Sequence, residues 1–220
     1  MEKSLDDRLA LAMDENSTAA ELQELAKDKD ASVREEVACN PNTPPAMLLE
    51  LAKDREWLVR GGVAFNSNTP QDALLALAKD VAMEVRGQVA CNKQTPPGAL
   101  EDLAKDDDGW VREGVAGNTA TPPALLWDLA KDEEEEVRYE VARNPASPHD
   151  LLSVLTKDEN WHVRCGVAAN SKAPAELLQE LSNDDNEFVR EEVALTKLDR
   201  SLVYLGPVQD SPKAAKRLKV

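Results

Sequence analysis

The sequence predicts an all-α solenoid made of about seven units of 26 residues each. The first observation is an arginine column with this period, at Arg8, Arg34, Arg60, Arg86, Arg112, Arg138, Arg164 and Arg190. The second is an aspartate column, at Asp28, Asp54, Asp80, Asp106, Asp132, Asp158 and Asp184. The third is that asparagine and proline recur in step, from Asn40 to Asn170 and from Pro44 to Pro174. Several columns held at one period indicate stacked structural repeats.

Each unit is expected to hold two short helices. The first follows a Thr-Pro pair such as Thr43-Pro44. We expect the threonine to be the N-cap and the proline to occupy the first helical position, where its missing N–H costs nothing. Inside this helix Leu48, Leu51 and Ala52 have the i, i+3, i+4 spacing of one apolar stripe.

The second helix is expected to be the shorter of the two. Val59 and Val63 lie one turn apart on it, and it should end near Asn66. Asparagine tolerates the left-handed conformation found at helix ends, and its side-chain amide can bond the loop backbone. Helices this short are marginal in isolation, so each unit must be held by its neighbours.

The ends of the chain depart from the repeat. Residues 1–195 are expected to form the solenoid, with a degenerate first unit as the N-terminal cap. Residues 196–220 are expected to form a C-terminal cap followed by a basic tail. Asp14 and Thr196 occupy the asparagine column in the outermost units.

Charge narrows the class of partner. The 220 residues carry a formal net charge of -16, and residues 196–220, with six basic and two acidic side chains, contribute +4 to it, so residues 1–195 carry -20. An acidic body disfavours direct binding to nucleic acid, which draws on Lys and Arg, and suits a basic protein partner. The chain has no apolar run of about 18 residues and no signal-peptide core at its start. We therefore expect a cytoplasmic protein that does not bind a membrane.

The repeat consensus resembles a known family. The elements are V-R-x-x-V-A-x-N, then T-P, then L-L-x-x-L-A-K-D, and they span roughly residues 6–195. At a 26-residue period they resemble the leucine-rich repeat variant (LRV) family, with HEAT-like helical repeats as the second choice. The resemblance implies a right-handed superhelix in which α-helices alternate with 3-10 helices, so one helix of each pair would be a 3-10 helix.

The resemblance does not bring a cofactor with it. The family includes a member whose N-terminal cysteine cluster binds a 4Fe–4S centre. This chain has only Cys39, Cys91 and Cys165, and such a cluster normally needs four converging thiolates. Cys39 and Cys91 lie two units apart, roughly 20 Å at about 10 Å per packed layer, too far for a disulfide. We expect no disulfide, no metal and no cofactor.

The repeated arginines and aspartates have two interpretations. As a structural ladder, the guanidinium bridges a carboxylate and nearby carbonyls. Asp54 precedes Arg60 by six residues in the same unit, and this offset recurs. The alternative is a ligand-binding row of arginines. The structural ladder is the stronger hypothesis, with the members Arg34, Arg60, Arg86, Arg112, Arg138, Arg164, Arg190, Asp54, Asp80, Asp106, Asp132 and Asp158.

No enzyme is expected. The only histidines are His149 and His162, and no phosphate-binding loop, nucleophile elbow or zinc motif is present. We therefore assign no catalytic, cofactor-binding or metal-binding residue. The function predicted is a non-enzymatic protein–protein interaction scaffold.

The candidate partner-binding residues vary between units. The turns after two successive first helices form an acidic ridge, which Trp110 and Trp127 could supplement as apolar anchors. The ridge comprises Asp106, Asp107, Asp108, Asp132, Glu133, Glu134, Glu135 and Glu136. It could dock a basic protein, or serve only as a solvated edge, and the tryptophans could instead cover seams between units. The alternative functions are an inhibitor that mimics nucleic acid and a redox-associated repeat protein lacking the family's iron–sulfur cluster.

Overall fold

A computed structural model of the chain describes residues 3–205, with side chains as far as residue 198. Fifteen α-helices and no strands occur among these residues. The predicted all-α helical-repeat solenoid is therefore confirmed. No helix in the part of the chain that the structure describes is long and apolar enough to cross a membrane.

Two kinds of helix alternate along the chain. The first kind has nine residues and, from α3 on, contains the V-R-x-x-V-A element. Its members are α1 (Leu5–Met13), α3 (Ala31–Cys39), α5 (Trp57–Phe65), α7 (Met83–Cys91), α9 (Gly109–Gly117), α11 (Glu135–Arg143) and α13 (Trp161–Ala169). α1 occupies the same place in the first unit, with a different sequence. The second kind follows the Thr-Pro pair and has seven residues: α2 (Ala19–Leu25), α4 (Pro45–Leu51), α6 (Gln71–Leu77), α8 (Pro97–Leu103), α10 (Pro123–Leu129), α12 (His149–Leu155) and α14 (Ala175–Leu181). The last helix, α15 (Glu187–Leu205), has 19 residues.

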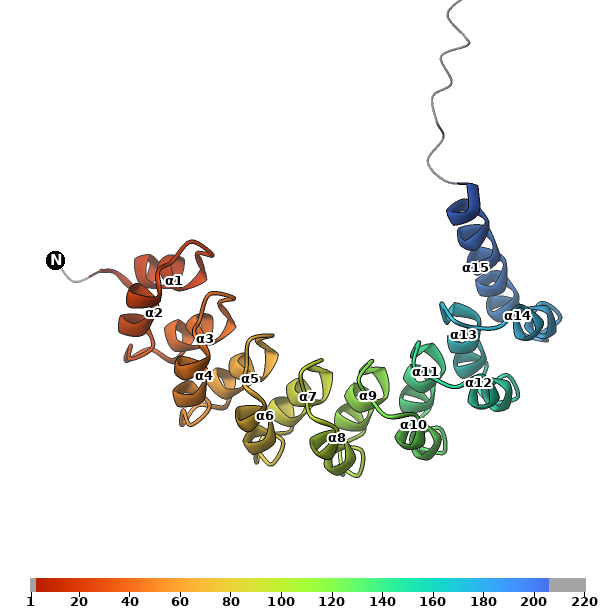
Figure 1. Cartoon of the computed structure of the whole chain (residues 1–220), viewed down its shortest axis with the longest axis horizontal. Helices are drawn as coiled ribbons and strands as arrows, with labels where there is room; N and C mark the ends of the chain where they lie inside the picture. The colour runs from red at the N-terminus through yellow and green to blue at the C-terminus, as the bar shows by residue number, and fades with distance from the viewer. Residues whose placement is uncertain (1–2, 206–220) are drawn as a thin grey trace, which may run out of the picture.

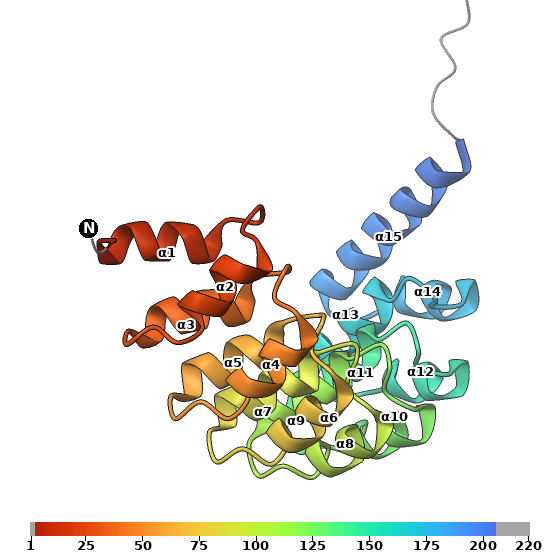
Figure 2. The same ribbon diagram turned by 60° about the vertical axis from the view of Figure 1, so that its left-hand side comes forward.

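The helices form two rows along an arc. Figure 1 shows the nine-residue helices on the inner, concave side and the seven-residue helices on the outer side. Successive nine-residue helices pack directly against one another, whereas contacts between successive seven-residue helices are fewer. Closer packing in the inner row than in the outer row bends the stack. Figure 2 shows the same arc turned by 60°, with α15 extending beyond the last pair.

The core lies between the two rows. On α5, Val59, Val63 and Ala64 are completely buried, and from the outer row Leu48 and Leu51 are 0% and 5% exposed. The same columns are buried in the other units. The predicted apolar stripe is therefore confirmed, and each unit completes its core only against its neighbours.

The prediction that the V-R helix is the shorter of the two was wrong. The V-R helix is the longer of the pair, because it begins two residues before its first valine and runs to the residue before the asparagine. Both helices of each unit are α-helical rather than one of them 3-10. The tighter i→i-3 pattern occurs at the ends of both helices, for example from Met47 N to the Pro44 carbonyl in the shorter helix and from Asn66 N to the Val63 carbonyl at the end of the longer one.

The threonine before each proline is not the N-cap. The proline occupies that place, as Pro44 does for α4 and Pro96 does for α8. The threonine is buried, and its hydroxyl turns back to the preceding helix: Thr95 Oγ1 donates to the Val89 carbonyl at 2.6 Å. The hydroxyl thereby satisfies a carbonyl at a helix C-terminus, where acceptors lack helical partners.

The C-terminal boundary expected at residue 195 falls inside α15, which continues to Leu205. The predicted basic tail and the end of the apolar capping segment lie outside the described residues. The 196–220 cap and tail thus stay a prediction.

Candidate partner-binding surface

An ion-pair ladder runs along the edge where the nine-residue helices begin. Each arginine pairs with the aspartate twenty residues further on, in the next unit. Arg112 Nε donates to Asp132 Oδ2 at 2.6 Å, and its Nη2 donates to Oδ1 at 2.9 Å. Seven such pairs link the units among the described residues: Arg8–Asp28, Arg34–Asp54, Arg60–Asp80, Arg86–Asp106, Arg112–Asp132, Arg138–Asp158 and Arg164–Asp184.

The carboxylate partner differs from the same-unit neighbour that the six-residue offset suggested. Arg60 does reach Asp54, but only through the backbone: Nη1 donates to the Asp54 carbonyl at 2.8 Å. Its carboxylate partner is Asp80. Each guanidinium thus joins the turn of its own unit to the turn of the next. Arg190 donates to the Asp184 carbonyl at 2.6 Å, and the position twenty residues beyond it lies outside the described residues.

The ladder also stabilises the ionised carboxylates. The hydrogen bond from Arg34 lowers the pKa of Asp54 and outweighs the opposing effect of burial. For Asp132 burial is the largest single influence and raises the pKa, but hydrogen bonds from Arg112 and from the Glu134 N–H, with the charges of two arginines, lower it overall. These carboxylates therefore stay ionised and paired with an arginine of the preceding unit.

A second ladder runs along the opposite edge, where the nine-residue helices end. Asn66 Nδ2 donates to the Ala38 carbonyl at 2.8 Å and to the Asn40 carbonyl at 2.9 Å, both in the preceding unit. Its Oδ1 accepts from the Asn68 N–H, as expected for a loop contact. The predicted left-handed conformation was wrong: Asn66 has φ -68° and ψ 126°. An extended backbone leaves the side chain free to reach back to the preceding unit.

The residues that replace asparagine in the outermost described units keep part of its bonding. Asp14 keeps the accepting half of the motif, because its Oδ1 accepts from the Asn16 N–H. Its carboxylate has no N–H to donate, whereas Asn40 Nδ2 donates to the Ala12 carbonyl at 2.7 Å. Thr196 keeps part of the donating half, with its hydroxyl 3.0 Å from the Ala168 carbonyl.

Two of the eight residues of the acidic ridge belong to the ion-pair ladder, and the others do not. Asp106 and Asp132 each bind a ladder arginine and have side chains only 9% exposed. Asp108 accepts from the Trp110 N–H at the start of α9, and Glu134 lies 3.6 Å from Arg112. The remaining ridge residues are exposed on the edge of the arc: Asp107, Glu133, Glu135 and Glu136.

The two tryptophans proposed as anchors lie on different rows. Trp110 is on α9 in the inner row and is 41% exposed. Trp127 is on α10 in the outer row and packs partly buried against the core. The two tryptophans therefore cannot contact the same part of a partner, and only Trp110 lies beside the side chains of the concave face.

The concave face carries side chains that vary from unit to unit over a fixed core. One column alternates glycine with a larger polar residue: Glu36, Gly62, Gln88, Gly114, Glu140, Gly166 and Glu192. The glycines allow close helix approach, since a Cβ at Gly114 would meet the Ala90 Cβ at 2.9 Å. Sequence reasoning missed this alternation, although it is visible as a 52-residue period.

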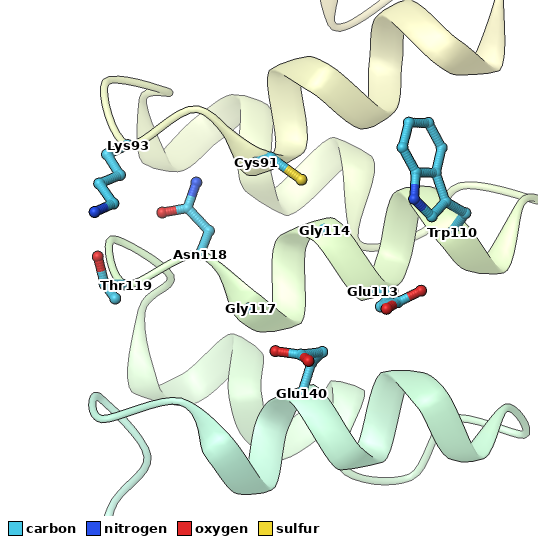
Figure 3. Close-up of a pocket in the computed structure, with 9 residues that line it drawn as sticks. All are labelled: Cys91, Lys93, Trp110, Glu113, Gly114, Gly117, Asn118, Thr119 and Glu140. Carbon is cyan, nitrogen blue, oxygen red and sulfur yellow. The ribbon is translucent and has the colours of Figure 1, made fainter. Parts of the chain in front are cut away.

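A groove of about 210 Å³ lies on this face between α7, α9 and α11. Figure 3 shows its floor along the α9 backbone from Gly114 to Gly117, with Trp110 at one end and Lys93 at the other. Glu113 and Glu140 contribute carboxylates to it. Burial, followed by the nearby charges of Glu140, Glu136 and Glu134, raises the pKa of Glu113.

Two further hollows lie near the N-terminal half. One, of about 190 Å³, lies on the concave face and is lined by residues that include Glu35, Trp57 and Phe65. The other, of about 680 Å³, lies between α2 and α4 in the outer row, and apolar side chains such as Ala20 and Met47 line much of it. Neither hollow contains a histidine.

The described residues contain no group of three or more His, Cys, Asp or Glu side chains arranged to hold a metal. Burial, and then neighbouring glutamates, raises the pKa of Cys39 to about 11, and burial with nearby carboxylates does the same for Cys165. His149 lies 3.5 Å from Glu176, and His162 stacks on Tyr139 with ring centroids 3.9 Å apart.

Comparison with solved structures identifies the repeat. A leucine-rich repeat variant with a novel repetitive structural motif matches with a TM-score of 0.57 and 32% identity, covering 82% of this chain and 72% of that one. YibA from E. coli matches at TM-score 0.48 and 19% identity over 93% of this chain and 80% of its own. An engineered protein matches at TM-score 0.41 and 17% identity, over 84% of this chain and 96% of its own. Because their TM-scores are below 0.5, YibA and the engineered protein carry no argument about this chain.

No protein-family model and no curated protein matches the chain. The 26-residue consensus predicted an LRV protein, and the 32%-identical structure, of which the chain covers 72%, confirms it. The chain belongs to the leucine-rich repeat variant family.

Proposed function

We propose that this protein is a non-enzymatic scaffold that binds a basic protein partner along its concave face and the adjoining acidic edge. The observation that carries the proposal is that some columns of the repeat are constant and others vary. Residues that bond unit to unit repeat throughout, whereas the outward residues of the inner row differ from unit to unit. A fixed frame with varied outward side chains presents an extended surface for recognition.

Charge supports a basic partner. The chain has a net charge of -16, and Asp107, Glu133, Glu135 and Glu136 remain exposed beside the concave face. Complementary charge of this kind acts mainly on the association rate and weakens as salt rises.

A nucleic-acid mimic is supported less well. That alternative rests on regularly spaced carboxylates, and the column that recurs in the most units is that of the ladder aspartates. They are bound to arginines, as Asp80 is to Arg60 and Asp158 is to Arg138. An exposed carboxylate column with the same spacing spans fewer units, from Asp107 and Glu133 to Glu159 and Asp185.

The test uses a fluorescently labelled peptide of alternating lysine and serine as a basic probe. We expect the wild-type protein to bind it, and replacement of Glu133, Glu134 and Glu135 by lysine to slow association and flatten its salt dependence. A peptide of alternating glutamate and serine is the control and should not bind. Failure of the wild type to bind the basic probe, or equal binding of both peptides, would refute a basic partner.

A further inference from the structure

We infer that the groove between α7, α9 and α11 receives a lysine or arginine side chain from an extended basic segment of the partner protein. The cation lies between Glu113 and Glu140, and its methylene stem lies against Trp110. This inference rests on the proposed function and gives it a specific contact.

The floor of the groove is open because it is backbone. Gly114 and Gly117 are separated by one helical turn of α9, and no side chain rises from either (Figure 3). A Cβ at Gly117 would first meet a carboxylate oxygen of Glu140, at 3.1 Å. The hollow of about 210 Å³ therefore lies directly between that carboxylate and the Cys91 side of the groove.

The walls of the groove carry two carboxylates, those of Glu113 and Glu140. Within the described part of the chain Glu113 forms no ion pair, and Glu140 has one, to Arg143 at 3.1 Å. Lys93 is the only basic residue that lines the groove, and Figure 3 places it at the end away from Glu113. A half-buried carboxylate without a cationic partner gains more from an incoming cation than an exposed one does, because charge-assisted hydrogen bonds strengthen in a less polar site.

Trp110 provides the apolar part of the contact. Its ring lies across the backbone of Gly87 on α7: a Cβ at Gly87 would be 2.0 Å from Trp110 Cζ3. The ring is thus supported from below, yet it remains 41% exposed. Such a surface suits the methylene stem of a lysine or arginine, and the ring face attracts the cation itself.

Charge complementarity selects this occupant among others. The solenoid body of a second copy, residues 1–195, would bring a net charge of -20 to an acidic groove. Nucleic acid would bring phosphates to the same carboxylates. A basic segment is attracted, and an open groove crossing several helices admits an extended chain rather than a folded domain.

The test measures binding of the labelled lysine–serine peptide to full-length variants. Glu113→Gln, Glu140→Gln and Trp110→Ala should each weaken binding about tenfold, as a contact at the centre of an interface does. Gly117→Leu fills the groove without changing the charge and should weaken binding at least as much. The matched controls are Glu101→Gln, Asp102→Asn and Gly98→Leu on α8, where a Cβ at Gly98 would meet nothing within 4 Å. Circular dichroism melting verifies that each variant folds.

Each outcome decides a different point. Weakening by the groove variants with intact binding by the α8 controls supports the groove. Equal weakening by both sets overturns the groove but keeps the scaffold, because the peptide then responds to overall charge. No binding by the wild type overturns the scaffold proposal as well. A fall in the protein's mass by light scattering in Gly117→Leu, with peptide binding unchanged, makes a second copy the occupant and overturns the inference.

Discussion

Removing one guanidinium from the ladder should destabilise the solenoid at a single junction. Arg112→Ala takes away two hydrogen bonds to the Asp132 carboxylate, at 2.6 and 2.9 Å, and one to the Asp106 carbonyl, at 2.9 Å. Both side chains of the pair are shielded: Arg112 is 11% exposed and Asp132 is 9% exposed. The substitution therefore leaves a carboxylate without its partner in a place that water reaches poorly.

The expected loss follows from that shielding. Breaking a buried pair costs about 3–5 kcal/mol, and a pair about one-tenth exposed belongs near the lower end, about 3 kcal/mol. For a chain of this length, a loss of about 3 kcal/mol corresponds to a fall of about 6–12 °C in Tm. Arg55→Ala is the matched control, because Arg55 is 78% exposed beside Glu56. An exposed pair contributes at most about 1 kcal/mol.

The assay is urea and thermal unfolding followed by circular dichroism. Because units in a solenoid are coupled to their neighbours, a new early transition counts as loss of stability alongside a lower midpoint. The double variant Arg112→Ala/Asp132→Ala should lose less than the sum of the single variants, since it leaves no buried charge unpaired. If Arg112→Ala unfolds like Arg55→Ala but loses peptide binding, the arginines form a binding row and the structural reasoning is refuted.

Three further predictions concern pH, the asparagine ladder and the thiols. Ladder aspartates with a lowered pKa contribute stability that is present above their ordinary value of 3.8 and lost as pH falls through the lower folded value. Glu35 and Glu113 have a raised pKa, so each costs stability while it is ionised, and this cost disappears as the pH falls and the carboxyl is protonated. Tm should therefore rise as pH falls from neutral towards about 5 and then fall below about 4. A steady rise in Tm down to about pH 3 would contradict this. Asn118→Asp removes the amide that donates to two carbonyls of the preceding unit and puts a buried acceptor in its place. The free energy of unfolding in urea should fall by about 3 kcal/mol. A loss below about 1 kcal/mol would count against a structural role for the asparagine column. Cys39 and Cys165, each with a pKa of about 11, should react with iodoacetamide at pH 8 about a hundredfold more slowly than in the unfolded chain, and comparable rates would show that the folded thiols are not shielded.

The repeat made the frame of the molecule predictable, because periodic columns report contacts that recur in every unit. Val59 and Leu48 could be placed in the core from spacing alone, and both are buried. The partner of each ladder arginine could not be found in the same way. Asp54 and Asp80 stand in the same column, so only the direction of stacking, known from the structure, shows that Arg60 binds the second.

The concave face was harder to predict because its function depends on what does not repeat. The acidic turns were visible as runs of charge, but the ladder uses some of those carboxylates, including Asp106. The alternation of Gly114 with Glu140 was present in the sequence. It acquires meaning only when adjacent helices are known to lie side by side. Gly114 then packs closely against Ala90, and Gly117 on the same helix faces the carboxylate of Glu140 in the groove.

The most direct test of the account is fluorine NMR of the protein labelled with 5-fluorotryptophan. The chain has four tryptophans: Trp57, Trp110 and Trp161 lie on the inner row, and Trp127 lies on the outer row. Single Trp→Phe variants assign the four resonances. Adding the lysine–serine peptide should shift the Trp110 resonance most and leave that of Trp127 in place. A shift of Trp127 with Trp110 unchanged would contradict binding on the concave face.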